Sequence, residues 1–341
     1  LSHLNGKSHV NALLIVTLAH QDKQPQPFQK HNENDTYAHL SELCNQANIN
    51  LYITHFANAI NDSMVLSWRF ENGEWKMLEL PASEITISYA DLPQNFPSAN
   101  VLRNLLIKNG VIFINHLNMS DSLTDKVLTY QLFPNSIPPT FDTSLPDLSE
   151  RLLNVSTHPD LRTDKIILKP RYGERGKGIE VIELAEVDSD RVAQMEDYII
   201  QPIMESDSGI PELGIEGRHD LRMLVYNGEI KDCFVRVPQK DNFICNQSHG
   251  GRLIYININD IPEKIRGIAG EIDKALSHYS PRYYSIDIGV GRSGKIWVYE
   301  LNTMPGVVWN ADASDKEKYF PMHKTIVNAI ESAAVRAGVM S

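Results

Sequence analysis

The strongest constraint on the fold comes from residues 285–302, where apolar and polar side chains alternate along two short segments joined by a glycine-containing turn. Alternation with a period of two predicts a β-hairpin that has one apolar face and one polar face. With a two-residue turn at Ser293-Gly294, counting outward along both strands places Asp287 opposite Glu300. Asn302 then lies on the same face as these two carboxylates. The other face is expected to carry Ile286, Ile288, Val290, Trp297, Tyr299 and Leu301.

The polar face of this hairpin predicts a metal site. Adjacent carboxylates repel each other unless a cation lies between them. Oxygen ligands without His or Cys favour magnesium, for which manganese can substitute. We therefore expect Asp287, Glu300 and Asn302 to bind metal. The alternative is that they are solvated residues on a half-exposed hairpin.

A glycine-rich segment, Lys169-Pro-Arg-Tyr-Gly173-Glu-Arg-Gly176-Lys-Gly178, suggests a phosphate-binding loop. Glycine lets backbone N–H groups approach an anion without interference from a Cβ atom. The residues that follow, 179–182, have a β pattern, whereas a Rossmann fingerprint opens a helix and a Walker loop ends in GKS or GKT. The sequence therefore predicts a flexible loop between two antiparallel strands that folds over nucleotide phosphates. A plain glycine-rich hairpin turn is the alternative.

Composition restricts the partners of the chain. Its 341 residues are roughly two domains' worth, and 43 acidic against 32 basic side chains give a net charge of -11. A negative field argues against nucleic acid or an anionic membrane as the main partner, but not against a small anion held in a local basic pocket. The three cysteines, Cys44, Cys233 and Cys245, are too dispersed for a zinc or disulfide framework, which favours a cytoplasmic protein. The apolar stretch 12–19 is too short to span a membrane.

The order of predicted elements indicates a mixed α/β and α+β chain. A small open α/β domain comes first, with Asp35 as the N-cap of its first helix and Asn72-Gly73 as a hairpin turn. Prolines 134, 138, 139 and 146 mark a connecting segment, and an α+β unit follows from about residue 150. Helices are expected at 35–47, 99–109, 123–133, 260–279 and 322–337, and strands at 11–19, 51–56, 64–70, 74–80, 85–90, 111–114, 165–169, 178–184, 198–203, 220–226, 229–236, 285–289 and 295–301.

From about Asp125 to the C-terminal helix the chain resembles the ATP-grasp superfamily, and within it the bacterial glutathione synthetases and the ribosomal-protein glutamate ligases. The resemblance rests on motifs that occur in the family's order. They are Asp125-Lys126, Ile166-Ile-Leu-Lys169-Pro with the glycine-rich loop, Tyr198-Ile-Ile-Gln201-Pro, Asp220-Leu-Arg222, Val235-Arg236-Val-Pro-Gln, Asn246 with Gly250-Gly251, and Asp287 followed by Glu300-Leu-Asn302-Thr-Met-Pro-Gly306.

The resemblance implies an N-terminal α/β substrate domain (1–118), a central lid subdomain (119–200) and a C-terminal subdomain with the metal site (201–341), with ATP between the last two. It also implies roles for single residues. ATP contacts are expected from Lys126, Lys169, Gly173, Gly176, Gly178, Gln201, Ile203 and Asp220; catalysis from Arg222 and Arg236; two magnesium ions on Asp287, Glu300 and Asn302; and substrate contacts from Asn246, His249, Gly250, Gly251 and Arg252.

The function that the resemblance implies is ATP-dependent ligation of a small carboxylate to an amine, with amino acids or peptides as substrates. The carboxylate is activated as an acyl phosphate, and ADP and phosphate are released. Two alternatives stay open at this point: an ATP-grasp kinase that forms no amide, and a regulatory module that holds ATP without turnover. Relatives are often dimers, but no interface can be read from the chain.

Overall fold

The computed structural model describes residues 9–90, 92, 97–143, 159–172, 178–186, 195–238 and 252–340. The chain divides into two compact units. Unit 1 consists of Leu1–Asp121, His278–Tyr283 and Thr303–Ser341, and unit 2 of Ser122–Ser277 and Tyr284–Asn302. Residues 303–341 thus pack with N-terminal residues, and the division into three domains at residues 118 and 200 stays a prediction. None of the described helices combines the length and apolar character needed to cross a lipid bilayer.

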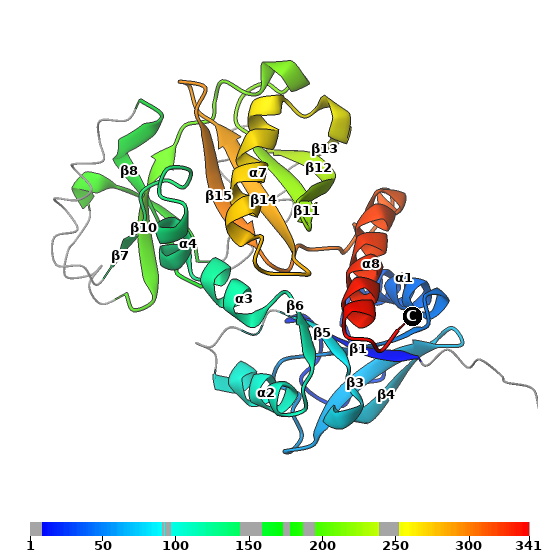
Figure 1. Cartoon of the computed structure of the whole chain (residues 1–341). Coiled ribbons are helices and arrows are strands. Elements are labelled where there is room, and N and C mark those ends of the chain that lie inside the picture. The colour runs from blue at the N-terminus through cyan, green and yellow to red at the C-terminus, as the bar shows by residue number, and fades with distance from the viewer. Residues whose placement is uncertain are drawn as a thin grey trace, which may run out of the picture. The chain divides into compact units, whose positions relative to one another are not determined.

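Unit 1 contains a six-stranded sheet in the order β4-β3-β2-β1-β5-β6 (Figure 1). Strands β2, β1, β5 and β6 run parallel, and β3 and β4 add an antiparallel hairpin at one edge. This arrangement confirms the open α/β domain expected from the sequence. The strands are β1 (Val10–Ile15), β2 (Ile49–Thr54), β3 (Met64–Glu71), β4 (Glu74–Pro81), β5 (Ile87–Ala90) and β6 (Ile112–Ile114).

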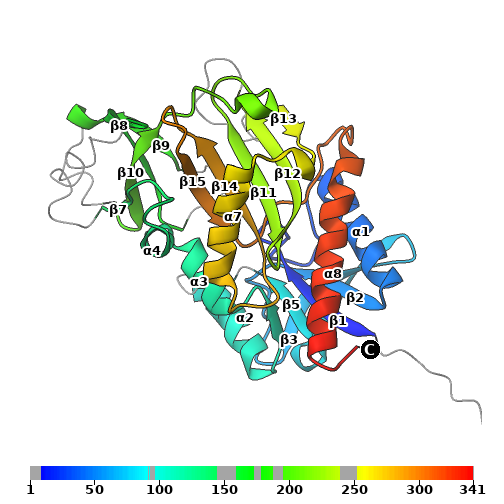
Figure 2. The ribbon, with the colours of Figure 1, turned by 45° about the horizontal axis from the view of Figure 1, so that its top comes forward.

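Helices bury both faces of this sheet. Helix α2 (Pro97–Lys108) packs its leucines against the face that carries Leu13 and Ile15. Helices α1 (His31–Gln46) and α8 (Phe320–Arg336) pack side by side over the other face (Figure 2), where α8 contacts β5 and β6. Parallel strands covered on both sides must be apolar on both sides, and Leu13 and Leu14 are both buried.

Two local predictions for unit 1 have different outcomes. The Asn72-Gly73 turn is confirmed: both residues have positive φ, +54° and +83°, as a two-residue type I′ hairpin turn requires. The N-cap at Asp35 is wrong, because α1 begins at His31 after Lys30. The preceding loop sets this start, since the Asn34 amide accepts from the Phe28 N–H (3.2 Å) and donates to the Phe28 carbonyl (2.8 Å).

Unit 2 contains two sheets. The first has the order β7-β10-β8-β9, and its strands β8 and β9 are antiparallel, as predicted for the strands that flank the glycine-rich loop. The second has the order β13-β12-β11-β14-β15. The strands are β7 (Phe141–Asp142), β8 (Leu161–Pro170), β9 (Glu180–Glu183), β10 (Tyr198–Met204), β11 (Asp220–Tyr226), β12 (Glu229–Val237), β13 (Arg252–Tyr255), β14 (Tyr283–Val290) and β15 (Ile296–Asn302).

The helices of unit 2 determine which face of its second sheet is covered and which face carries Asp287. Helix α7 (Glu263–Leu276) lies across this sheet (Figure 2), and its Asp273 accepts a hydrogen bond from the Tyr284 hydroxyl of β14 (3.2 Å). Alternation along β14 therefore turns Tyr284 and Ile286 toward α7 and Asp287 away from it. The single helix predicted at 123–133 is in fact two, α3 (Leu117–Thr124) and α4 (Lys126–Leu132), because Asp125 caps a new helix.

The carboxylate hairpin forms with a different turn from the one predicted. Asp287 lies opposite Glu300, which confirms the expected pairing. However, Val290 pairs with Ile296 across a longer turn, rather than with Trp297 across a two-residue turn. A register shift then leaves Tyr299 as an extra residue on β15, a β-bulge that restores the pairing of the carboxylates.

This bulge moves two aromatic side chains to the other face of the hairpin. Trp297 pairs with Gly289, and a Cβ atom on Gly289 would lie 2.1 Å from the Tyr299 hydroxyl. The prediction that Trp297 and Tyr299 share the apolar face of Ile286 is therefore wrong. Both aromatic side chains instead pack with Leu161 of β8 and Met204 of β10, which joins the two sheets of unit 2.

Candidate functional site

Two arginines and two aspartates form a buried ion-pair network on the second sheet of unit 2. Arg222 on β11 grips Asp287 on β14 with two hydrogen bonds of 2.6 Å, from Nε to Oδ1 and from Nη2 to Oδ2. Arg236 on β12 donates from Nη2 to Asp287 Oδ2 (2.6 Å) and to Asp220 Oδ2. Strand order explains the convergence, because β12, β11 and β14 are consecutive neighbours.

The network sets the protonation states of its carboxylates. Burial alone would raise the pKa of Asp287, but Arg222 and Arg236 outweigh it and hold that pKa below the ordinary range. Burial and the charge of Asp287 raise the pKa of Asp220, against the opposing effect of Arg236. Among the described residues, Asp220 Oδ1 and Arg236 Nε are buried without a hydrogen-bond partner. Such atoms are costly unless a ligand or water satisfies them.

Two lysines lie within electrostatic reach of Glu300 on β15. They are Lys169 on β8, in the first sheet of unit 2, and Lys126 on α4. Lys126, the first residue of α4, lies 3.5 Å from Glu300 on β15, measured from Nζ to Oε1. Burial, and then the charge of Lys126, lower the pKa of Lys169 to about 8, whereas Glu300 opposes the shift. Glu300 also acts on Arg236, whose pKa its charge helps to raise. Glu300 therefore lies within electrostatic reach of both lysines and of the arginine network.

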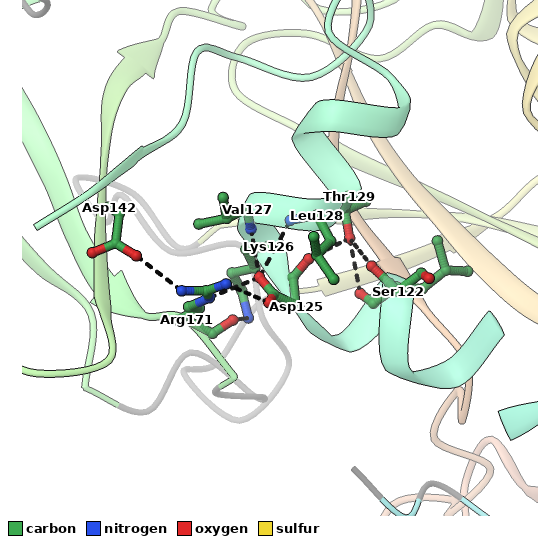
Figure 3. A network of polar contacts seen from close by, with 9 residues as sticks. Ser122, Asp125, Lys126, Val127, Leu128, Thr129, Asp142 and Arg171 are labelled. Atoms are coloured by element: carbon green, nitrogen blue, oxygen red, sulfur yellow. Dashed lines mark hydrogen bonds and ion pairs between the residues drawn. The ribbon is translucent and has the colours of Figure 1, made fainter. Parts of the chain in front are cut away.

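A second polar network holds Lys126 in place (Figure 3). Asp125 caps α4 by accepting from the backbone N–H groups of Val127 (2.9 Å) and Leu128 (3.3 Å). The same carboxylate accepts two hydrogen bonds from Arg171, from Nε (2.9 Å) and Nη2 (2.6 Å). Arg171 reaches on to Asp142 of β7 with Nη1 (2.9 Å). Its guanidinium is thus engaged with two carboxylates at the end of β8.

The remaining predicted site residues lie on separate elements. Asn302 pairs with Ser285, so register places it on the Asp287 face of the hairpin. Gln201 lies in β10, where its side chain donates to Thr140 (2.6 Å), and a register shift follows Pro202, before Ile203. Gly178 has a φ of +76° and lies against Pro170. Arg252 is exposed on β13. Gly173, Gly176, Asn246, His249, Gly250 and Gly251 lie outside the described residues.

The donor set suits a hard cation. Asp287, Glu300 and Asn302 offer oxygen atoms on one face, and Asp287 Oδ1 accepts only one of the hydrogen bonds described above. Among the described residues, no group of three or more His, Cys, Asp or Glu side chains is arranged to hold a metal ion, either on this face or elsewhere. The buried Ser285 Oγ, which has no described hydrogen-bond partner, lies on the same face. These residues therefore fit a magnesium site made of oxygen ligands.

Sequence reasoning missed Asp160, which anchors the turn of the carboxylate hairpin. This fully buried carboxylate accepts from the Ser293 N–H (2.7 Å), the Ser293 hydroxyl (2.5 Å) and Trp297 Nε1 (3.3 Å). Its partners are more than 130 positions away, so no local pattern indicates the contact. The capping role of Asp125 did have a local signal, an Asp directly before a helical pattern.

Comparisons with known proteins show sequence similarity over part of the chain. A family model described as YheC/D like ATP-grasp matches residues 190–330. The glutathione synthetase of Xylella fastidiosa (strain Temecula1 / ATCC 700964) is 27% identical over 228 residues, which cover 63% of this chain and 65% of that protein. The match thus spans slightly less than two thirds of this relative.

Solved structures extend the similarity over nearly the whole chain. The D-alanine–D-alanine ligase of Bacillus anthracis has a TM-score of 0.59 at 12% identity and covers 94% of this chain and 97% of its own. The ATP-grasp ligase PsnB, complexed with minimal precursor, Mg and ADP, has a TM-score of 0.55 at 13% identity. The match covers 95% of this chain and 97% of the PsnB chain. The chain therefore has the fold of these ligases, and its residues 190–330 are similar to the YheC/D like ATP-grasp family.

Proposed function

We propose that this protein is an ATP-dependent ligase that joins a carboxylate to an amine. The observation that carries the proposal is the position of Glu300, which interacts with Lys126 and Lys169 on one side and with Arg236 on the other. A phosphate-binding pair of lysines and an arginine–carboxylate network thereby form one continuous charged site. Such a site matches phosphoryl transfer, where positioning and charge stabilisation supply most of the catalysis.

The two lysines bind the phosphates of ATP in this proposal. Lys169 has no hydrogen bond or ion pair from its ammonium group to another described residue, and its charge is disfavoured by burial and by Lys126. A phosphate placed between the two ammonium groups removes that penalty. Gln201 and Ile203 pair with the adenine edge through the backbone carbonyl and N–H that flank Pro202, which has no donor.

Asp287, Glu300 and Asn302 hold magnesium in this proposal, with manganese able to replace it. The metal supplies charge neutralisation at the transferring phosphoryl group. Arg222 and Arg236 orient Asp287 through their hydrogen bonds to its carboxylate. The unsatisfied Nε of Arg236 provides a donor for an oxyanion at the same place.

The reaction proceeds in two steps. A carboxylate oxygen of the substrate attacks the γ-phosphorus of ATP, the bond to the β-phosphate oxygen breaks, and ADP leaves with that electron pair. The amine nitrogen then attacks the acyl carbon, the carbon–oxygen bond to phosphate breaks, and the amine proton passes to solvent. The predicted loop at Gly173 and Gly176 would exclude water from the acyl phosphate. Asn246, His249, Gly250, Gly251 and Arg252 stay proposed substrate contacts.

Amino acids or short peptides are the proposed substrates. The glutathione synthetase, the D-alanine–D-alanine ligase and the precursor-bound ligase support this class by their names. A net charge of -11 favours such small substrates over nucleic acid. Cytoplasmic location and homo-oligomer formation stay predictions.

The test is an assay of ADP release with pooled carboxylates and pooled amines, followed by mass spectrometry of the products. We expect ADP formation that requires both pools and a product whose mass equals the sum of acid and amine minus water. ADP release without an amine, together with a phosphorylated product, would identify a kinase instead. Binding of ATP without turnover under any combination would identify a regulatory module.

A further inference from the structure

We propose that Arg171 and Asp125 act as positioning residues that fix the ammonium group of Lys126 for the nucleotide phosphates. This inference rests on the proposed function, because it takes Lys126 to be a phosphate ligand. The alternative is that Arg171, which lies in the glycine-rich segment, contacts phosphate directly.

The hydrogen bonds of Arg171 argue against direct phosphate binding. Its Nε and Nη2 donate to Asp125, and its Nη1 donates to Asp142. Three of the five N–H donors thus bind carboxylates, and the bidentate geometry toward Asp125 is the one in which such pairs are strongest. Hydrogen bonding to Asp125 raises the pKa of Arg171, so that the pair stays ionised. A phosphate could bind the Nε and Nη2 edge of the guanidinium only by displacing Asp125.

Asp125 connects Arg171 to the start of α4. The carboxylate that holds Arg171 also accepts from the N–H groups of Val127 and Leu128, so one side chain both caps the helix and fixes it to the end of β8 (Figure 3). The Thr129 hydroxyl completes the anchorage by donating to backbone carbonyls, including that of Asp125 (2.8 Å). The start of α4 therefore has little freedom to rotate or shift along β8.

Lys126 is held by the backbone of Arg171, next to the ion pair between Arg171 and Asp125. Its backbone N–H donates to the Arg171 carbonyl at 3.3 Å, and its Nζ is 3.5 Å from the same oxygen. The ammonium group of Lys126 therefore lies near the end of β8, at Arg171, which is two residues after Lys169. It also faces Glu300. Arg171 also joins the turn before β10, because its N–H donates to the Asp197 carbonyl (2.7 Å). Removing the guanidinium should release Lys126 without removing its charge.

The experiment compares the binding of ADP and adenosine by isothermal titration calorimetry without divalent metal. Arg171→Met removes the guanidinium, Asp125→Asn keeps a helix-capping side chain but weakens the ion pair, and Lys126→Met removes the ammonium. Arg162→Met is the matched control, because Arg162 lies at the opposite end of β8 and pairs with Asp164 (2.9 Å from Nε to Oδ1). Thermal unfolding verifies that each variant is folded.

We expect Arg171→Met and Asp125→Asn to weaken ADP binding about tenfold, a size usual for coupled neighbours, and to leave adenosine binding unchanged. The double variant Lys126→Met/Arg171→Met should bind ADP as weakly as Lys126→Met alone. Multiplied losses would overturn the inference by showing that Arg171 contacts phosphate independently. Equal losses for ADP and adenosine, or no loss, would also overturn it. If Arg171→Met is unfolded, Asp125→Asn decides by the same criteria. Failure of the wild-type protein to bind ADP would instead contradict the proposed function and the inference with it.

Discussion

Asp287 lies directly across from Glu300 because a bulge at Tyr299 compensates for a longer turn between their strands. The two carboxylates nevertheless have different partners. Asp287 is held by Arg222 and Arg236, whereas Glu300 faces Lys126. One residue of the pair is thus fixed by surrounding arginines, and the other is within reach of the lysines that we assign to phosphate. Substitutions at the two positions should therefore have distinguishable effects.

Glu300→Ala should abolish ADP formation while the fold stays intact. The variant removes a proposed metal ligand and leaves Lys126 without its carboxylate partner, so we expect a fall in kcat of about a hundredfold or more. Steady-state ADP release measures the rate, and circular dichroism checks the fold. Glu183→Ala is the control, since Glu183 pairs with Lys165 on β8 at 2.6 Å, away from the proposed metal face. Unchanged turnover in Glu300→Ala would remove this residue from the site.

ADP binding should weaken as the pH rises above about 8. Lys169 has a pKa lowered to about 8, so its ammonium is present below that pH and is lost above it. Calorimetric titration without metal should show an affinity that is level near pH 7 and falls toward pH 9.5, by up to about tenfold per pH unit. Lys169→Arg should flatten this profile, because arginine stays protonated throughout. A wild-type affinity independent of pH would refute the assignment of Lys169 to phosphate.

Asp160→Ala should destabilise unit 2. The substitution leaves the Ser293 N–H and Trp297 Nε1 without their buried acceptor, which costs about 2–4 kcal/mol in the free energy of unfolding. Urea unfolding followed by tryptophan fluorescence measures the loss. The matched variant Asp164→Ala removes an exposed carboxylate on β8 and should change stability by less than about 0.5 kcal/mol. Similar losses in both variants would contradict an anchoring role for Asp160.

His323 should make unit 1 less stable in mild acid. Burial lowers the pKa of His323 to about 4, against 6.5 when unfolded, and the neutral ring lies between the Val307 carbonyl (3.0 Å) and His39 (2.9 Å). As the pH falls, His323 therefore binds a proton in the unfolded chain at a higher pH than in the folded chain. The contribution of neutral His323 to the free energy of unfolding is fully present above pH 6.5. It declines toward pH 4, and the loss is about 2 kcal/mol at pH 5.

Denaturant unfolding at pH 7 and pH 5 measures this loss. His323→Gln should be less stable than wild type at pH 7 but should lose less stability between the two values. A wild-type stability that does not change between pH 7 and pH 5 would contradict the buried neutral state of His323.

Local signals predicted much of the fold. The Asn72-Gly73 turn and the pairing of Asp287 with Glu300 were predicted from residues close in sequence, and both are confirmed. The N-cap of α1 was wrong because Asn34 ties a loop to the helix start. The bulge at Tyr299 was missed because it satisfies packing between two sheets, which no pattern within one strand records.

Motifs indicated the site residues but not their partners. Arg222 and Arg236 were each predicted near an oxyanion, yet their sharing of Asp287 depends on β14 lying beside β11, more than 50 residues apart in sequence. The clamp of Arg171 on Asp125 similarly requires α4 to lie at the end of β8. Such contacts arise from strand order and tertiary packing, and a single sequence carries no direct signal for them.

The return of residues 303–341 to unit 1 has a consequence for synthesis on the ribosome. Helix α8, which packs beside α1 over the first sheet, is translated after every strand of unit 2. The six-stranded sheet therefore emerges early, but the part of its face at β5 and β6 that α8 contacts stays uncovered until residues 320–336 have been made. Unit 2 can complete its core sooner, so the part of the protein translated first is the part that finishes folding last.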